Sequence, residues 1–228
     1  MSNQSYNYDE QEPFAAAEFA ENPEPRCPCI LLLDTSTSMQ GDSINELNNG
    51  LRAFRQELFE DSLSLKRVEI AVITFGPVTV VQDFTTADRL RPMQLEASGE
   101  TPLGAAVARG LTLLKQRKEL LRSNGIKLFR PWIFLMTDGV PTDKWQHLPE
   151  IIRHGEENKS FSFFALGVNN ADFSVLRQIA VREPMKLSGV RFQEFFLWLS
   201  ASLKNVSRSN PGDKVAIPDY KPYGWADV

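Results

Sequence analysis

Three oxygen-bearing side chains follow an early apolar run at alternate positions, namely Asp34, Ser36 and Ser38. They come directly after Ile30 to Leu33, a run typical of a strand that is buried on both faces. In a turn, side chains at alternate positions can converge on one point. Carboxylate and hydroxyl oxygens are hard ligands, which suit Mg²⁺ or Mn²⁺ better than zinc. The spacing therefore indicates part of a metal site at the end of a strand.

Two later segments supply further oxygens. Thr101 lies on a loop shaped by glycine and proline directly before a predicted helix, and Asp138 follows a second apolar run with Gly139 behind it. Together the segments offer three hydroxyls and two carboxylates, one of which reaches the ion through water. A divalent cation in such a set has too few anionic ligands. Such a cation takes an acidic oxygen from outside. The sequence therefore predicts a metal site that binds a carboxylate of a partner and is formed by Asp34, Ser36, Ser38, Thr101 and Asp138.

The elements that position these residues follow from hydrophobic periodicity. Besides the first run, strands are predicted over 68–75, 78–81, 132–136, 160–168 and 185–187, and helices over 43–60, 102–122, 145–157, 172–180 and 191–206. Strands that alternate with helices predict a parallel sheet between two helical layers. In such sheets, ligand sites form at the carboxyl ends of the strands. Gly76-Pro77 joins two strands as a hairpin, so one edge strand is predicted to be antiparallel.

Composition excludes several classes of protein. The 228 residues suit one α/β domain with tails, and a net charge of -4 argues against a nucleic-acid or anionic-membrane binder. No stretch approaches the roughly 18 apolar residues that span a bilayer, and the acidic N-terminus lacks a secretory-signal pattern. Cys27 and Cys29 are too close for an unstrained disulfide. Free thiols in a cytoplasmic protein are the prediction.

The chain divides into an acidic, proline-containing arm (1–26), a domain (27–208) and a tail rich in proline and aromatic residues (209–228). Two alternatives stay open for the aromatic residues of the arm, which either pack onto the domain or form a recognition segment; they are Tyr6, Tyr8, Phe14 and Phe19. A basic run follows within the second long helix and is interpreted as its solvated face; it comprises Lys115, Arg117, Lys118 and Arg122.

The three oxygen-bearing segments together resemble the metal-ion-dependent adhesion site of von Willebrand factor type A domains. The matching motifs are Asp-x-Ser-x-Ser from Asp34, Thr-Pro-Leu-Gly from Thr101, and Thr-Asp-Gly around Asp138. They fall in the family's order and spacing over residues 27–208. The resemblance implies a doubly wound, mostly parallel six-stranded sheet with one antiparallel edge strand and helices on both faces.

The resemblance also implies roles for the site residues. Ser36 and Ser38 would bind the ion directly, and Asp34, Thr101 and Asp138 would exchange direct and water-mediated roles. Mg²⁺ is the expected ion, with Mn²⁺ and Ca²⁺ as alternatives. Thr37 departs from the glycine that is commonest at this position in the family, which predicts a tighter loop.

Within the family, the chain is most similar to bacterial cytoplasmic members called TerY-like, which are associated with tellurite resistance and stress. The similarity rests on Leu-Leu-Leu-Asp-Thr-Ser, on Asn-Asn-Gly-Leu from Asn48, and on the segment from Phe134 to Asp143. It implies an adaptor whose partner, a kinase or phosphatase encoded nearby, offers a Glu or Asp to the metal. The acidic arm is a second candidate ligand, acting as a mask.

Helix capping is the plain alternative for the polar residues. Asp42 or Ser43 is expected to cap the helix at 43–60, which leaves the earlier trio unexplained. Thr101 is expected to cap the helix that it precedes as well as to bind the ion. Asp143 is expected to cap the helix that follows it.

Catalysis is the main rival function. A magnesium-dependent hydrolase or phosphatase of the haloacid-dehalogenase type also places an aspartate after a buried strand, but it carries a second Asp two residues later, where this chain has Ser36. A serine hydrolase would need a histidine near Ser36 or Ser38, and His147 and His154 fall in a polar predicted helix. The sequence favours a binding protein over an enzyme. A scaffold that binds partners through its tails is a third alternative.

Overall fold

The computed structural model describes residues 18–169, 171–217, 219 and 221–223. At its centre lies a six-stranded sheet of order β3-β2-β1-β4-β5-β6. All neighbouring pairs are parallel except β2 and β3, which form the predicted antiparallel hairpin. The expected fold class is therefore confirmed. The strands are β1 (Cys27–Asp34), β2 (Val68–Phe75), β3 (Thr79–Thr86), β4 (Trp132–Thr137), β5 (Ser162–Gly167) and β6 (Met185–Lys186).

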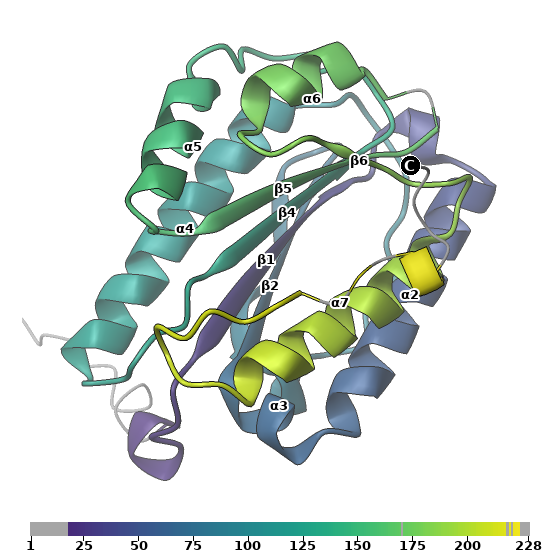
Figure 1. Cartoon of the computed structure of the whole chain (residues 1–228). Helices are drawn as coiled ribbons and strands as arrows, with labels where there is room; N and C mark the ends of the chain where they lie inside the picture. The colour runs from purple at the N-terminus through teal and green to yellow at the C-terminus, as the bar shows by residue number, and fades with distance from the viewer. Residues whose placement is uncertain (1–17, 170, 218, 220, 224–228) are drawn as a thin grey trace, which may run out of the picture.

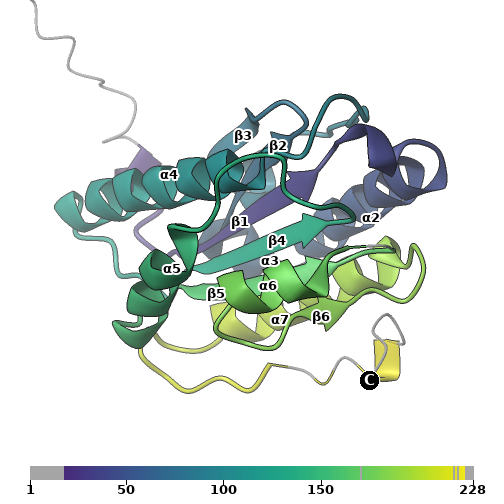
Figure 2. The same ribbon diagram turned by 90° about the horizontal axis from the view of Figure 1, so that it is seen from above.

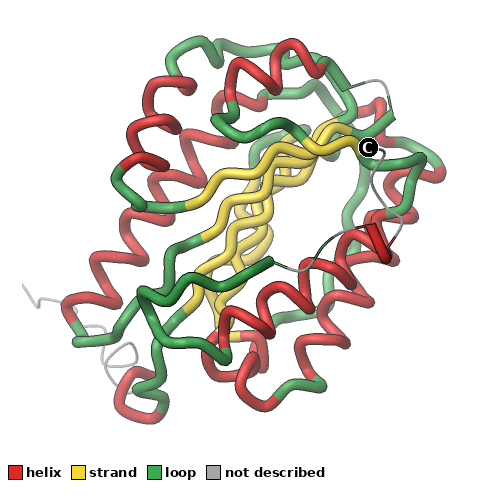
Figure 3. Tube along the Cα trace, viewed as in Figure 1, coloured by secondary structure: helices red, strands yellow, loops and turns green. Residues whose placement is uncertain are grey.

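Helices cover both faces of the sheet (Figures 1 and 3). One layer holds α2 (Asp42–Phe59), α3 (Ser62–Arg67) and α7 (Phe192–Ser207), and the other holds α4 (Leu103–Ser123), α5 (Leu148–Glu157) and α6 (Phe173–Ile179). Three short 3₁₀ turns are also present, namely η1 (Thr37–Met39), η2 (Ala87–Arg89) and η3 (Lys221–Tyr223), and residues 18–21 are helical. No helix in the described part of the chain is both long and apolar enough to cross a bilayer.

The strand β1 serves both hydrophobic cores because its side chains alternate between the faces of the sheet. Leu31 and Leu33 join the core under α2 and α7. Ile30 and Leu32 join the core under α4. All four side chains are fully buried, which is why the run is apolar without interruption.

Gly50 lets α7 approach α2 closely. A methyl group at this position would lie 2.6 Å from the ring of Phe196 and 3.0 Å from the backbone of Phe192. The rings of Phe54 and Phe196 meet beside it, with centroids 5.4 Å apart. The aromatic residues of α7 belong to the core, since Phe195, Phe196 and Trp198 are at most 3% exposed.

Three details of the elements differ from the prediction. The helix α3 was not predicted, because six residues are too few to show helical periodicity; it starts where the Asp61 carboxylate accepts a hydrogen bond from the Ser64 amide at 2.7 Å. The strand β3 continues to Thr86, beyond the predicted end at Val81. The helix α2 follows Gly41, whose φ is 85°, and neither Asp42 nor Ser43 caps it.

Part of the acidic arm packs against the domain. We call residues 18–26 the N-terminal strap; Figures 1 and 2 show it beside the end of α4. Phe19 is 4% exposed and packs with Leu121 and Ile126. The packing alternative therefore holds for Phe19, whereas Tyr6, Tyr8 and Phe14 lie outside the described residues.

The strap ends in a buried ion cluster. Arg26 and Glu69 are both fully buried, and the Glu69 carboxylate accepts hydrogen bonds from Arg26 Nε at 3.1 Å and from Arg117 Nη2 at 2.6 Å. Arg117 also lies 3.4 Å from Glu18. The interpretation of the basic run as a solvated face is therefore wrong for Arg117, whose side chain is 10% exposed. A distant carboxylate on β2 holds it inside.

Candidate metal centre

The ends of β1 and β4 bring two carboxylates to one edge of the sheet. The strands are parallel neighbours, with Leu33 opposite Met136, so Asp34 and Thr137 end side by side. Asp34 Oδ1 accepts a hydrogen bond from the Ser36 amide at 2.8 Å, and its Oδ2 accepts one from Thr137 Oγ1 at 2.5 Å. Two donors thus hold a carboxylate that is 1% exposed.

A chain of hydrogen bonds joins the first loop to Asp138. The hydroxyl oxygens of Ser36 and Ser38 lie 2.9 Å apart, and Ser38 Oγ donates to Asp138 Oδ1 at 2.6 Å. Ser36 and Asp138 are buried, whereas Ser38 is exposed to solvent. The cluster therefore opens outward at Ser38, where a ligand from another molecule can enter.

Thr101 lies at the same edge. Its side chain is 6% exposed, and a methyl group added at Gly139 would lie 3.3 Å from Thr101 Oγ1 and 3.8 Å from Ser38 Oγ. A side chain at this position would crowd the Thr101 hydroxyl, which Gly139 leaves free. The structure thus brings all five predicted residues together.

Two predicted caps are wrong. Thr101 does not cap α4, whose N-cap residue is Pro102 without a side-chain bond. Asp143 does not cap α5; its carboxylate instead accepts hydrogen bonds from the Gly104 and Ala105 amides at 2.8 and 2.7 Å, at the start of α4. The cap comes from a loop about forty residues away in the chain, so local sequence could not indicate it.

Thr37 fastens the first loop to the second. Its amide and its hydroxyl both donate to the Gly99 carbonyl, at 3.0 and 2.9 Å. The Ser98 amide donates to the Thr35 carbonyl at 2.7 Å. Gly99 has a φ of 74°, and a methyl group there would lie 2.4 Å from the Gly76 carbonyl. The tighter loop predicted from Thr37 is therefore the loop after β1, which two hydrogen bonds from Thr37 hold against Gly99.

Burial raises the pKa of both carboxyl groups. Loss of hydration is the main cause for Asp34 and for Asp138, and the negative charge of Asp138 adds to the rise at Asp34. Hydrogen bonds from Ser36 and Thr137 act in the opposite direction at Asp34. Two carboxylates that lose hydration side by side favour a cation between them. The donors are all oxygens, which is the chemistry that Mg²⁺ prefers.

The described residues offer little to the rival sites. They hold no group of three or more His, Cys, Asp or Glu side chains placed for a metal. Cys27 and Cys29 are free and buried, as expected. Within the part of the chain that the structure describes, neither serine hydroxyl bonds a histidine; the ring of His154 pairs with Asn158 on its own helix. A histidine base of the kind that activates a serine nucleophile is therefore not in place at Ser36 or Ser38 among the described residues.

Thr137 is the residue that sequence reasoning missed. It belongs to the Thr-Asp-Gly motif, but its hydroxyl serves Asp34 across the sheet and not its neighbour Asp138. The signal was a hydroxyl at the last position of a buried strand, where an apolar residue would otherwise be expected.

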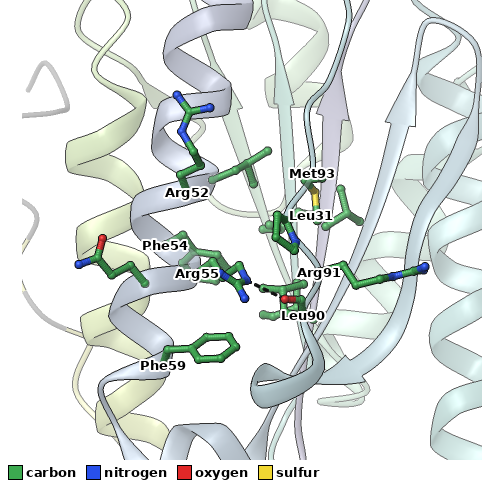
Figure 4. A pocket seen from close by; sticks show the side chains of 13 residues that line it. Leu31, Arg52, Phe54, Arg55, Phe59, Leu90, Arg91 and Met93 are labelled. Carbon is green, nitrogen blue, oxygen red and sulfur yellow. Dashed lines mark hydrogen bonds between the residues drawn. The ribbon is translucent and has the colours of Figure 1, made fainter.

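A separate cavity of about 450 Å³ lies between α2 and residues 90–93 (Figure 4). Its walls include Leu31, Phe54 and Phe59, with arginine side chains at its rim. Arg55 Nε donates to the Leu90 carbonyl at 2.7 Å, and its guanidinium lies 4.4 Å from the Phe59 ring. None of the five predicted metal residues lines this cavity, so the candidate metal centre is distinct from it.

Comparisons with known proteins agree with the fold. The model of the von Willebrand factor type A domain matches residues 29–195, and no curated protein matches. Among solved structures, proximal thread matrix protein 1 from the mussel byssus is 19% identical with a TM-score of 0.52, over 79% of this chain and 48% of that one. Pilus adhesin SpaC from Lactobacillus rhamnosus GG, in its open conformation, is 13% identical with a TM-score of 0.54, over 79% of this chain and 30% of that one. This chain spans less than half of either protein, and the likeness concerns the fold alone.

Proposed function

Because the chain belongs to the von Willebrand factor type A domain family, we propose that it is a protein-interaction module that binds an acidic side chain of a partner through a divalent cation. The observation that carries the proposal is the chain of hydrogen bonds from Ser36 through Ser38 to Asp138, with Asp34 and Thr101 at the same edge. Mg²⁺ fits this oxygen set best.

The residues divide the work by their positions. Ser36 and Ser38 would ligate the cation directly, and Asp34, Thr101 and Asp138 would complete the set directly or through water. The cation supplies positive charge for the carboxylate of a partner. Thr137 and the Ser36 amide hold the Asp34 carboxylate in one orientation. The carboxylate therefore loses little conformational entropy when the cation binds. Val140, 58% exposed and directly after Gly139 in the chain, offers an apolar contact to a partner.

We assign the protein to the TerY-like group of bacterial stress and tellurite-resistance systems, as a cytoplasmic adaptor without catalytic activity. Its partner is a kinase or phosphatase encoded nearby. The supporting observation is the set of three motifs quoted above, from Leu31, Asn48 and Phe134. This assignment is more specific than the proposal of a metal site. If it is wrong, the proposal of a metal site still stands.

A pull-down from bacterial lysate, with this chain as bait, tests metal-dependent binding of a partner. The wild-type chain should capture a partner in Mg²⁺, should lose it in EDTA, and should regain it when Mg²⁺ is restored. The Asp34→Ala variant should capture nothing. Glu100→Ala is the matched control, because this exposed acid lies on the loop of Thr101 and should leave capture unchanged.

Thermal melting of each variant separates loss of the site from loss of the fold. Capture that persists both in EDTA and in Asp34→Ala would overturn the proposal and favour binding through the tails. Turnover of a phosphomonoester by the pure protein, lost in Asp34→Ala, would instead favour a hydrolase.

A further inference from the structure

A second pocket lies at the opposite end of the sheet from the candidate metal centre. It has a volume of about 650 Å³ and is lined where β4 and β5 begin, by the end of α4 and by residues 209–217 after α7. We call it the basal pocket. Trp132 and Ser162, the first residues of β4 and β5, belong to its wall. In Figure 1 these strand ends lie away from the arrowheads, on the side of the N-terminal strap.

The basal pocket is strongly positive in a protein that is negative overall. Five cationic side chains line it against one acidic residue, Asp213; the cations are Lys118, Arg122, Arg130, Lys159 and Lys214. Asp213 is engaged by the amide of Asn210 at 2.8 Å. Arg130 is paired with Glu156 at 2.6 Å. The remaining cations, among the residues that the structure describes, have no carboxylate within ion-pair distance.

Lys118 lies close to other cations without a compensating carboxylate. Among the residues that the structure describes, its ammonium bonds the Ser160 carbonyl, at 3.0 Å, and forms no ion pair. Burial lowers the pKa of Lys118, and the charge of Arg122 lowers it further. An anion in the basal pocket would remove this repulsion.

The N-terminal strap delivers an acidic segment to this place. Residues 1–17 contain Asp9, Glu10 and Glu12 and neither lysine nor arginine. The segment joins the strap at Glu18, whose carboxylate lies 3.4 Å from Arg117, the residue before Lys118 on α4. Its starting point is therefore fixed beside the last turns of α4, the helix that carries Lys118 and Arg122.

The acidic segment is long enough to reach the basal pocket from the N-terminal strap. Phe19 of the strap packs in a cluster with Leu128, and Leu128 also lines the basal pocket. Six residues separate Glu12 from Glu18, which is about 20 Å of extended chain. The metal edge lies farther away by the length of β4, six residues or about 17 Å. The exposed Ile217 on the wall suits the aromatic residues of the segment.

We propose that the basal pocket binds the chain's own acidic segment, residues 1–17, through the carboxylates of Asp9, Glu10 and Glu12. The segment then docks at the end of the molecule opposite the metal, and does not mask the metal. This inference is independent of the proposed function, since it needs neither a cation nor a partner.

Zero-length cross-linking of the full chain tests it. A carbodiimide joins carboxylates to lysine amines in direct contact, and mass spectrometry of the monomer identifies the pairs. We expect links from residues 9–12 to Lys118, Lys159 and Lys214, and their loss at high salt. Mixing ¹⁵N-labelled and unlabelled chains should show that the links form within one chain.

Arg122→Glu supplies the critical variant, because it reverses a charge of the pocket without removing a reactive amine. It should lower the yield of these links roughly tenfold, as expected when an attraction becomes a repulsion. Arg109→Glu is the matched control on the same helix, about 20 Å away, and should change nothing.

Four results would overturn the proposal. Links that favour Lys144, near the metal edge, would place the segment over the metal. Equal yields to the pocket lysines and to exposed Lys66, or yields unaffected by Arg122→Glu, would mean that no docking occurs. Links only between differently labelled chains would assign the pocket to the segment of a second copy.

Discussion

At the scale of single residues, Asp34 depends on a neighbour, Thr137, that is not among the proposed ligands. Thr137 donates to it from the adjacent strand at 2.5 Å, and this bond fixes the direction of the carboxylate. Outer groups of this kind commonly change metal affinity by tenfold to a hundredfold. The hydroxyl of Thr137 is therefore part of the proposed site, although it binds no ion.

We expect Thr137→Val to weaken Mg²⁺ and Mn²⁺ binding about tenfold, because it removes the donor and keeps the shape. Isothermal titration with each ion measures the change. Thr142→Val is the control, since Thr142 is an exposed threonine in the loop that follows. Equal affinity in both variants would show that Thr137 does not position Asp34.

The two thiols make a pH-dependent prediction. Burial raises the pKa of Cys27 from 9.0 to about 12, and it also raises that of Cys29. The folded chain therefore keeps protons that the unfolded chain releases above about pH 9, so the free energy of unfolding should fall as pH rises from 9 toward 12. The slope approaches roughly 1.4 kcal/mol per pH unit for each thiol.

Urea unfolding between pH 7 and 10.5 checks this slope, and Cys27→Ala should reduce it. In the native protein neither thiol should react with a disulfide reagent at pH 8. Rapid labelling without denaturant would contradict the burial of both side chains.

At the scale of elements, the contact of α2 with α7 rests on one missing side chain. Gly50→Ala would gain roughly 1 kcal/mol of helix propensity but would force a methyl group against Phe196 and the backbone of Phe192. Overpacking of this kind costs about 1–3 kcal/mol. We therefore expect net destabilisation, measured by urea unfolding. The double variant Gly50→Ala/Phe196→Leu should recover part of the loss; full additivity would mean that the ring is not the obstacle.

The buried strands and long helices could be predicted because each leaves a local pattern, which is a continuous apolar run in a buried strand and apolar residues three or four apart in a helix. The run Ile30–Leu33 and the spacing in α2 carry that information locally. The six-residue α3 and the side chain that caps α4 could not be predicted in this way, although the predicted start of α4 at 102 lies one residue from the observed start at Leu103. The α4 cap is Asp143, a contact across loops that only the folded chain creates.

For the site, too, the positions of the residues could be predicted from local motifs, whereas some of their hydrogen bonds could not. The positions of Asp34, Thr101 and Asp138 follow from motifs at predicted strand and helix ends, and the structure places them at one edge. The bonds of Thr37 to Gly99 and of Thr137 to Asp34 depend on the register of neighbouring strands and loops. No local pattern encodes that register.

At the scale of the whole molecule, the cluster of Arg26, Glu69 and Arg117 joins the N-terminal strap to β2 and α4. Removing the central carboxylate would leave the buried Arg26 without its ion-pair partner and Arg117 with Glu18 alone. We expect Glu69→Gln to lower the free energy of unfolding by about 3–5 kcal/mol. Glu183→Gln, in the exposed pair with Arg177, should change it by less than about 1 kcal/mol.

Urea unfolding of the two variants provides the comparison. If Glu69→Gln does not fold, Arg117→Met tests the same cluster with the Arg26–Glu69 pair still in place. Equal stabilities of the buried and exposed variants would show that the cluster is solvated.

The bond between Asp143 and the start of α4 has a mechanical consequence. The Thr142 amide also donates to the Thr101 carbonyl at 3.0 Å, so the loop after Asp138 and the loop of Thr101 are tied by three hydrogen bonds, and Thr37 ties the second loop to the first. A pulling force on a bound carboxylate would therefore be distributed over all three loops and transmitted to β1, β4 and α4 together. Because the force is shared in this way, we expect the ligand to dissociate before any of the loops detaches from the sheet.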